Sequence, residues 1–184
     1  ILLRALRTPI CRARKGGFKN TPPEELLAAV LQAVREQTGI DPGLVEEICV
    51  GNVLPPGGGA TVARMAALYA GYPHTGSVMT VNRQCSSGLQ AVASVAMAIK
   101  AGVIAAGIGA GVESMSLHYG PQAMAPSISE QVMAHPEAAD CLLPMGITSE
   151  RVAQQFGVGR EEQDRLAMAS HHKAAKAQKE GLFK

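Results

Sequence analysis

Apolar residues along positions 21–112 change between helical spacing and short continuous runs. Apolar positions three and four residues apart predict helices over residues 22–38, 61–70 and 87–101. Short apolar runs predict strands at residues 48–50, 78–81 and 103–112, and residues 1–3 are interpreted as the end of an earlier strand. The last run is apolar on both faces, as in a strand covered on both sides. This alternation predicts an α/β layered domain with a largely buried sheet.

The first helix carries the clearest boundary signals. Thr21 is expected to cap it, with Pro22 at the first helical position and Glu24 completing a capping box. Gly39 is expected to end it, because glycine readily adopts the left-handed conformation that follows many helices.

Residues 116–144 lose the hydrophobic period and contain four prolines, which are Pro121, Pro126, Pro136 and Pro144. The segment is interpreted as a long loop or an inserted subdomain, and long loops in compact domains are usually functional. Helices are predicted beyond it at residues 149–156 and 160–179. We therefore divide the chain into a first domain of residues 1–116 and a second part of residues 117–184.

Composition excludes several classes of function. Of the 184 residues, 47% are hydrophobic and 17% are charged, which is typical of a globular protein. A net charge of +2, an aromatic content of 3% and the absence of Trp argue against a nucleic-acid partner. No apolar run approaches the roughly 20 residues that a membrane span needs. The four cysteines form no CxxC pair, which argues against a zinc ribbon and a disulfide scaffold and favours a reducing compartment.

The beginning of the chain is basic and contains no acid before Glu24. A basic, acid-poor start is typical of a transit peptide. Pro9 and the Gly16-Gly17 pair would break an amphipathic helix, so the segment is interpreted as part of the folded domain. The chain begins with Ile rather than Met, so a targeting segment, if any, is expected upstream.

Cys85 is the residue that suggests chemistry. It lies where the predicted strand 78–81 gives way to a helix that begins at Ser86 or Ser87. Free backbone N–H groups and the helix dipole favour negative charge at a helix start, so the thiolate form of Cys85 is expected to be favoured there. The small residues Ser86, Ser87 and Gly88 leave room for an acyl group. The alternative interpretation is a buried, inert cysteine.

The surrounding residues resemble the acyl-enzyme motif of thiolases, and most closely that of the peroxisomal degradative 3-ketoacyl-CoA thiolases. That motif is Asn82-Arg83-Gln84-Cys85-Ser86-Ser87-Gly88-Leu89-Gln90-Ala91. Other segments resemble the family in the same order: Ala5-Leu6-Arg7-Thr8-Pro9, Val50-Gly51-Asn52-Val53-Leu54, Ala63-Arg64-Met65-Ala66-Ala67, Gly109-Ala110-Gly111-Val112-Glu113-Ser114-Met115-Ser116 and Pro144-Met145-Gly146-Ile147-Thr148-Ser149-Glu150.

The resemblance implies a thiolase-like layered α/β fold, as the truncated N-terminal half of a thiolase with part of the loop domain that covers the CoA thioester. It implies thiolytic cleavage of 3-ketoacyl-CoA by CoA in fatty-acid β-oxidation, with Cys85 as the acyl-thioester nucleophile. Met115 and Met145 are expected to line the substrate site. CoA is a substrate, and no metal or redox cofactor is expected. A homodimer and a peroxisomal location are implied, with the mitochondrion as the alternative.

The remaining catalytic groups of the family, a base histidine and a second cysteine, are expected in a C-terminal half beyond this chain. The chain alone is therefore expected to be inactive. No base is assigned within it, because none of its histidines lies in a matching context: His74, His118, His135, His171 and His172. Cys49 is expected in a buried strand, and Cys11 and Cys141 in loops. Lys173, Lys176 and Lys179 are interpreted as a solvated helix face rather than a phosphate site.

Three other functions remain open. One is a synthetic acetoacetyl-CoA thiolase, which preference for acetoacetyl-CoA would reveal. Another is a ketoacyl synthase of the same fold, which would decarboxylate a malonyl substrate. The third is a non-catalytic truncated chain that pairs with an intact thiolase subunit, and copurification with such a subunit would reveal it.

Overall fold

A computed structural model describes residues 2–120 and 127–183. The chain divides into two compact units, Ile1–Pro126 and Ser127–Lys184, which are described separately below. This division falls later than the boundary between residues 116 and 117 expected from composition. Pro121 and Pro126, which belong to the predicted loop, lie outside the described residues.

The first unit is built on a parallel sheet with strand order β2-β1-β3. Its strands are β1 (Glu47–Gly51), β2 (Ser77–Val81) and β3 (Gly107–Gly111). Glu47 pairs with both Ser77 and Gly107, so the three strands begin and end in register. The segments that follow the three strands therefore all leave from the same end of the sheet, where the carboxyl ends of the strands lie. The segment after β1 leaves between the other two.

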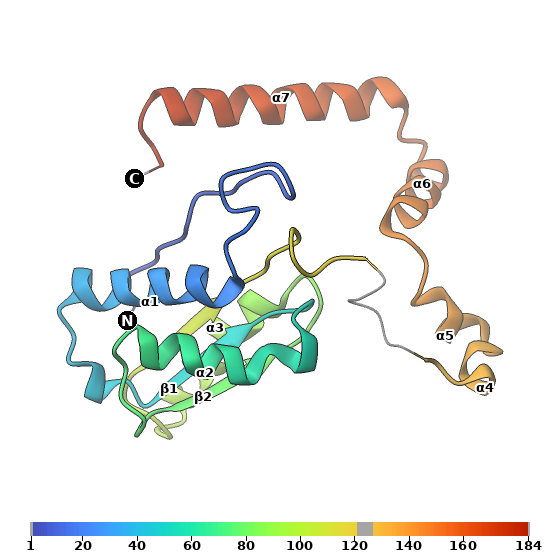
Figure 1. The fold of residues 1–184 in the computed structure, drawn as a ribbon. Coiled ribbons are helices and arrows are strands. Elements are labelled where there is room, and N and C mark those ends of the chain that lie inside the picture. Colours follow the sequence, from blue (N-terminus) through green and yellow to red (C-terminus); the bar gives the residue numbers. More distant parts are fainter. Residues whose placement is uncertain (1, 121–126, 184) are drawn as a thin grey trace. The chain divides into compact units, whose positions relative to one another are not determined.

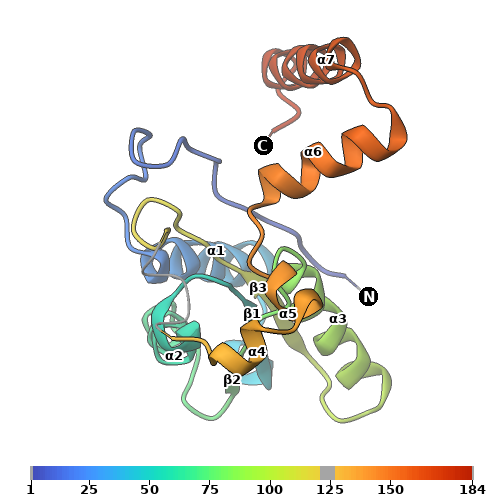
Figure 2. The ribbon, with the colours of Figure 1, turned by 90° about the vertical axis from the view of Figure 1, so that its right-hand side faces the viewer.

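Helices cover both faces of this sheet (Figures 1 and 2). Helices α1 (Pro23–Thr38) and α2 (Ala60–Tyr69) lie on one face, and α3 (Ser87–Lys100) lies on the other. Because side chains alternate along a strand, Ile48 and Val50 of β1 pack toward α1 and α2, while Cys49 packs toward α3. Two short 3-10 helices, η1 (Pro42–Leu44) and η2 (Pro56–Gly59), flank β1 in the sequence.

Two glycines allow α3 to lie close to the sheet. A Cβ atom at Gly51, the last residue of β1, would lie 2.3 Å from the carbonyl carbon of Ser87 at the start of α3. A Cβ at Gly109 in β3 would lie 2.5 Å from the Cα of Val92. Real Cβ atoms do not approach backbone atoms so closely, so glycine at these positions fixes where the first turns of α3 lie.

Two predicted boundaries are wrong by a few residues. Pro22, rather than Thr21, directly precedes the first turn of α1, and no side chain caps that helix. Thr21 therefore lies one residue too far from the helix to reach its free N–H groups. The third strand begins at Gly107 instead of residue 103, because the backbone N–H of Val103 still bonds to Ala98 at the end of α3.

The first predicted strand is not formed among the described residues. Leu2 and Leu3 are exposed, and none of the described strands pairs with them; Ile1 lies outside the described residues. A strand needs a neighbour for its backbone groups, and this segment has none here. The residues of β3 are mostly half-buried, but both faces of the strand are contacted, as predicted. Ile108 and Ala110 pack against the cluster that contains residues of α1 and α2, and Gly109 lies against Val92 of α3.

The second unit is helical. It contains α4 (Glu130–Met133), α5 (Pro136–Asp140), α6 (Met145–Phe156) and α7 (Arg160–Lys179). The segment expected to be a loop up to residue 144 thus holds the short helices α4 and α5, and α6 begins at Met145 instead of Ser149. None of the described helices is both long enough and apolar enough to cross a membrane.

Candidate active site

Cys85 occupies the turn between the end of β2 and the start of α3. The turn consists of residues 82–86, between Val81 and Ser87. The thiol-bearing residue is exposed to solvent. The structure therefore agrees with the expected position of Cys85 between a strand and a helix. Cys85 lies at the end of the sheet where all the parallel strands have their carboxyl ends.

The residue before Cys85 has an uncommon backbone conformation. Gln84 adopts φ 50°, in the left-handed region that residues other than glycine seldom occupy. The side-chain oxygen of Asn82 accepts a hydrogen bond from the backbone N–H of Gln84 at 3.0 Å, which closes an Asx turn and holds this conformation. Backbone strain of this kind concentrates at functional sites because the surrounding structure must maintain it.

The side chains of the two serines after Cys85 form hydrogen bonds with backbone groups of the turn. Ser87 Oγ accepts from the backbone N–H of Arg83 at 2.9 Å and donates to the carbonyl of Gln84 at 2.6 Å. Ser86 Oγ donates to the carbonyl of Arg83 at 2.9 Å. The Arg83 guanidinium donates to the Gln90 side chain one turn into α3. The turn is thus held by side chains of its own sequence motif, and Cys85 contributes none of these side-chain bonds.

The first turn of α3 presents unpaired backbone donors beside Cys85. Within the described residues, the N–H groups of Gly88 and Leu89 have no acceptor, whereas the N–H of Gln90 bonds to Ser86 at 2.9 Å. No side chain caps the helix. Free N–H groups and the helix dipole together stabilise negative charge at this end, which is the requirement for a thiolate nucleophile.

The other cysteines lack this environment. Cys49 is fully buried in β1, as predicted, and burial, with a smaller effect of Glu47, raises the pKa of its thiol. Cys11 and Cys141 are exposed, and the Cys141 thiol donates only a long contact of 3.7 Å to the carbonyl of Glu137. Cys141 follows α5 directly rather than lying in a longer loop.

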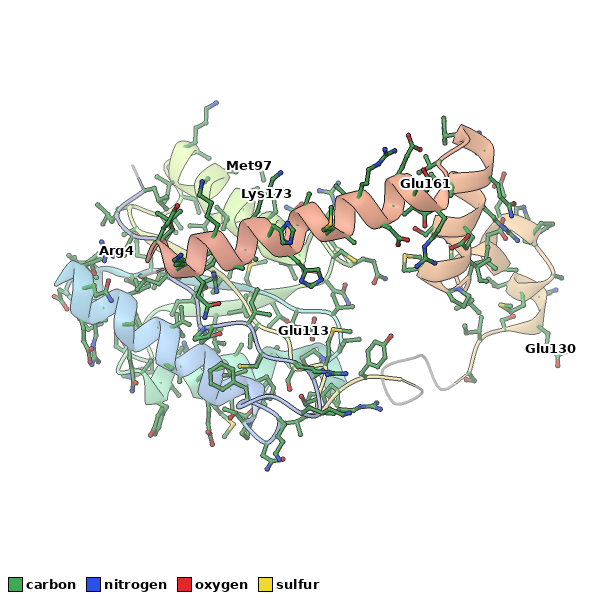
Figure 3. The ribbon with its side chains drawn as sticks, turned by 90° about the horizontal axis from the view of Figure 1, so that it is seen from above. Arg4, Met97, Glu113, Glu130, Glu161 and Lys173 are labelled. Atoms are coloured by element: carbon green, nitrogen blue, oxygen red, sulfur yellow. The ribbon has the colours of Figure 1, made fainter. Side chains whose placement is uncertain are left out.

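The other residues considered from the sequence are divided between the two units. Met115 lies in the first unit and is 46% exposed, whereas Met145 begins α6 in the second unit and is 71% exposed. His171, His172 and the lysines at 173, 176 and 179 are exposed on α7, where Lys173 is labelled in Figure 3. The described residues contain no group of three or more His, Cys, Asp or Glu side chains arranged to hold a metal ion.

Comparison with known families identifies the domain. The sequence matches the family described as "Thiolase, N-terminal domain" over residues 1–184. The chain belongs to this thiolase family. The resemblance inferred from the Cys85 motif is thereby confirmed.

Named relatives of this thiolase domain are 3-ketoacyl-CoA thiolases. The chain is 55% identical over 185 residues to peroxisomal 3-ketoacyl-CoA thiolase 2 of Arabidopsis thaliana. It is 51% identical over 183 residues to the peroxisomal 3-ketoacyl-CoA thiolase of Homo sapiens. These matches cover 100% of this chain but 40% and 43% of the relatives, so the chain spans about two fifths of the length of the curated relatives it matches.

Solved structures share the fold of this thiolase domain. The dimeric peroxisomal thiolase of Saccharomyces cerevisiae matches with a TM-score of 0.92 and 42% identity, over 100% of this chain and 48% of that one. The acetyl-CoA acetyltransferase of Bacillus anthracis matches with a TM-score of 0.81 and 36% identity, over 100% and 48% of the two chains. The thiolase-like layered α/β fold expected from the sequence is confirmed.

The sequence predicted Cys85 as the reactive residue, but it did not indicate the residues that shape the turn around it. The left-handed conformation of Gln84 left no signal in the residue type, since glutamine is not enriched in that region. Asn82, two residues before Gln84, was a usable signal because asparagine often closes an Asx turn over its second neighbour. The double role of Ser87 depends on the tertiary position of α3 and was not visible in the sequence.

Proposed function

We propose that this chain is the nucleophile-bearing part of a 3-ketoacyl-CoA thiolase and that Cys85 carries the acyl group. The observation that supports this most directly is the position of Cys85. It is an exposed thiol on a strained turn, at a helix start with free N–H groups. The named relatives, which are 3-ketoacyl-CoA thiolases, support the reaction class.

In the proposed reaction, the Cys85 thiolate forms a bond to the carbonyl carbon at C3 of a 3-ketoacyl-CoA. The carbonyl re-forms as the C2–C3 bond breaks, and the electron pair of that bond leaves on C2 as the enolate of acetyl-CoA. A general acid protonates C2, and the shortened acyl group remains on sulfur. The thiolate of a second CoA then attacks this thioester and releases the Cys85 thiolate.

The proposal divides the work between this chain and residues outside it. The first turn of α3 supplies free backbone N–H groups at the helix end where Cys85 lies. The proton transfers are assigned to a histidine and a second cysteine beyond Lys184, so this chain alone is expected not to turn over. CoA acts as a substrate, and the proposed steps need neither a metal nor a redox cofactor.

A peroxisomal location and a homodimer form part of the proposal. The relatives named above from Arabidopsis thaliana and Homo sapiens are peroxisomal, and the matching thiolase of Saccharomyces cerevisiae is both peroxisomal and dimeric. Strand β2 supports association, because it is an edge strand of the described sheet and its residue Met79 is 40% exposed. Cell fractionation and sedimentation test these two points, and a mitochondrial or monomeric protein would contradict them.

The decisive experiment is peptide mapping by mass spectrometry after brief incubation with acetyl-CoA. It is applied to the complete gene product, to this chain alone and to the Cys85→Ser variant. We expect an acetyl group on the Cys85 peptide of the complete product and none in the variant. The Cys141→Ser variant, which changes another exposed cysteine, is expected to acylate normally. Absence of an adduct at Cys85 in the complete product would refute the proposal.

A second candidate is a synthetic acetoacetyl-CoA thiolase, which the match to the acetyl-CoA acetyltransferase of Bacillus anthracis favours. Relative kcat/KM values for acetoacetyl-CoA and a long-chain 3-ketoacyl-CoA separate the two candidates. A degradative enzyme accepts the long chain, whereas a synthetic one is restricted to acetoacetyl-CoA.

A further inference from the structure

The loop after β1 lies between the ends of two other strands. Because β1 is the central strand, its following residues leave the sheet between the turn that contains Cys85 and the segment after β3. Glu113 belongs to that last segment (labelled in Figure 3). The loop is therefore placed to connect Glu113 with the Cys85 turn.

Glu113 holds this loop with both oxygens of its carboxylate. One oxygen accepts from the backbone N–H of Val53 at 2.9 Å, and the other accepts from the backbone N–H of Leu54 at 3.1 Å. Hydrogen bonds to an ionised carboxylate are stronger than those between neutral groups. The pair of bonds fixes both the position and the direction of the two peptide units.

The opposite side of the same loop contacts the Cys85 turn. The side-chain NH₂ of Asn82 lies 3.5 Å from the carbonyl oxygen of Val53, and the backbone N–H of Asn52 donates to the carbonyl of Val81 at 3.2 Å. The other side-chain atom of Asn82 accepts from the backbone N–H of Gln84, the residue before Cys85. Val53 thus contacts Glu113 through its N–H and Asn82 through its carbonyl.

The loop contains Pro55 and Pro56, whose rings fix φ after Leu54, but no such restraint acts on Val53 itself. It continues into η2 (Pro56–Gly59), in which three successive glycines, at positions 57, 58 and 59, have positive φ angles of 63° to 73°. Glycine in such a run restricts the backbone weakly. The position of Val53 therefore depends on its contacts with other segments, of which the carboxylate of Glu113 supplies the shortest.

We propose that Glu113 is a positioning residue for Cys85: by fixing Val53 and Leu54, its carboxylate holds the side chain of Asn82 and through it the strained Gln84 conformation that presents the thiol. Glu113 does not touch substrate in this arrangement and takes no proton. The inference rests on the proposed function, since it concerns the reactivity of the same cysteine.

The test compares Glu113→Ala and Glu113→Gln with the unchanged complete gene product. Alanine removes both acceptors, whereas glutamine keeps one oxygen and replaces the other with an NH₂ group. Since misplacement of a reacting group by about 1 Å costs up to about 100-fold in rate, we expect the Cys85 acylation rate and kcat to fall about 10- to 100-fold in Glu113→Ala. The acylation rate of Glu113→Gln should lie between those of Glu113→Ala and the unchanged protein. KM should change less than about twofold in both variants, because no substrate contact is lost.

Glu46→Ala is the matched control. The Glu46 carboxylate accepts a hydrogen bond from the backbone N–H of Ala105, at the opposite end of the same sheet. Replacing Glu46 with alanine removes a carboxylate–backbone hydrogen bond of the same kind and leaves the Cys85 turn unchanged. Because Glu46→Ala removes one such bond and Glu113→Ala removes two, we expect Glu46→Ala to lower the melting temperature less than Glu113→Ala does and to leave the acylation rate unchanged.

Several outcomes would overturn the inference. Equal loss of rate in both alanine variants would mean that Glu113 acts through stability alone. A Glu113→Ala enzyme with unchanged acylation would show that the loop does not position the thiol. A shifted pH profile of acylation with an unchanged maximum rate would indicate an effect of charge instead of position.

Failure of the proposed function gives a different result. If the unchanged protein is not acylated at Cys85, acyl transfer itself is refuted. The alkylation rate of Cys85 by iodoacetamide, with exposed Cys11 and Cys141 as references in the same sample, then tests Glu113 independently. A rate in Glu113→Ala equal to that of the unchanged protein refutes the positioning role there too.

Discussion

The side-chain oxygen of Asn82 lies 3.0 Å from the backbone nitrogen of Gln84 and accepts its hydrogen bond. This bond spans the peptide units directly before Cys85, so it links a side chain at the end of β2 to the presentation of the thiol. A neutral hydrogen bond contributes about 1 kcal/mol, and 1.36 kcal/mol corresponds to tenfold in rate.

We therefore predict that Asn82→Ala slows acylation of Cys85 about fivefold. Burst kinetics with an acyl-CoA measure this rate. Asn20→Ala changes an exposed asparagine outside the turn and should leave the rate unchanged. Acylation of the Asn82→Ala variant at the rate of the unchanged protein would contradict a role of this bond in holding the turn.

The left-handed conformation of Gln84 predicts an unusual response to glycine. A residue with a Cβ atom pays about 1 kcal/mol in this region, so Gln84→Gly should raise the free energy of unfolding by up to about that amount. Gln84→Val should lower it, because a β-branched side chain fits the region worse. Urea unfolding measures both changes.

Gln32→Gly is the control for this prediction, because Gln32 lies inside α1. Glycine within a helix costs about 1 kcal/mol, so this substitution should destabilise the protein. The two glutamine-to-glycine substitutions are thus expected to have opposite signs. Two losses of similar size would mean that Gln84 is not strained.

The close approach of Gly51 to α3 predicts that Gly51→Ala is severely destabilising. Its added methyl carbon would lie 2.3 Å from the Ser87 carbonyl carbon and 2.5 Å from the Gly88 nitrogen, which are backbone atoms without side-chain freedom. Overpacking of this kind costs about 1–3 kcal/mol. The shift of the first turn of α3 should also lower Cys85 acylation.

Gly88→Ala provides the comparison, since a Cβ at Gly88 meets no atom within 4 Å. Alanine is the better helix former by about 1 kcal/mol, so this variant should be neutral or more stable. Thermal unfolding of the two variants decides the point. Equal melting temperatures would show that the sheet and α3 are packed less closely than described.

Buried Cys49 predicts a loss of stability at alkaline pH. Burial raises the pKa of its thiol, so the folded state holds this proton more tightly than the unfolded chain does. Its contribution is fully present below the thiol pKa of the unfolded chain, about 8.5, and is lost as pH rises from there through the folded value. Burial also raises the pKa of the Tyr72 hydroxyl, although Arg35 has an opposing effect. This raised pKa extends the loss of stability to higher pH.

Cys49→Ala should therefore be less stable at pH 7, because a methyl-sized gap replaces sulfur in the core. Its stability should fall less steeply than that of the unchanged protein above about pH 8.5. Urea midpoints from about pH 7 to about pH 10.5 measure both curves. Parallel curves would mean that the Cys49 proton is not linked to folding.

Much of the fold was predictable because local patterns set it. The apolar spacing of α1 and α2, the short runs of β1 and β2, and the end of α1 at Gly39 all appear where the sequence predicted them. Some errors are local, such as the late start of β3, where the N–H of Val103 still bonds to Ala98, and one depends on distant neighbours. The segment at Leu2 and Leu3 is not a strand among the described residues because a strand forms only against another strand.

The sequence by itself indicated the family, through the resemblance of the motif around Cys85, and it predicted Cys85 as the reactive residue because that cysteine lies between a strand end and a helix start among small side chains. The tertiary structure decided how that residue is presented. The close contact of Gly51 with Ser87 and the hydrogen bond between Glu113 and Val53 join segments far apart in the chain. Such contacts arise only when the parallel strands bring their carboxyl ends to one edge, and no local pattern encodes that arrangement.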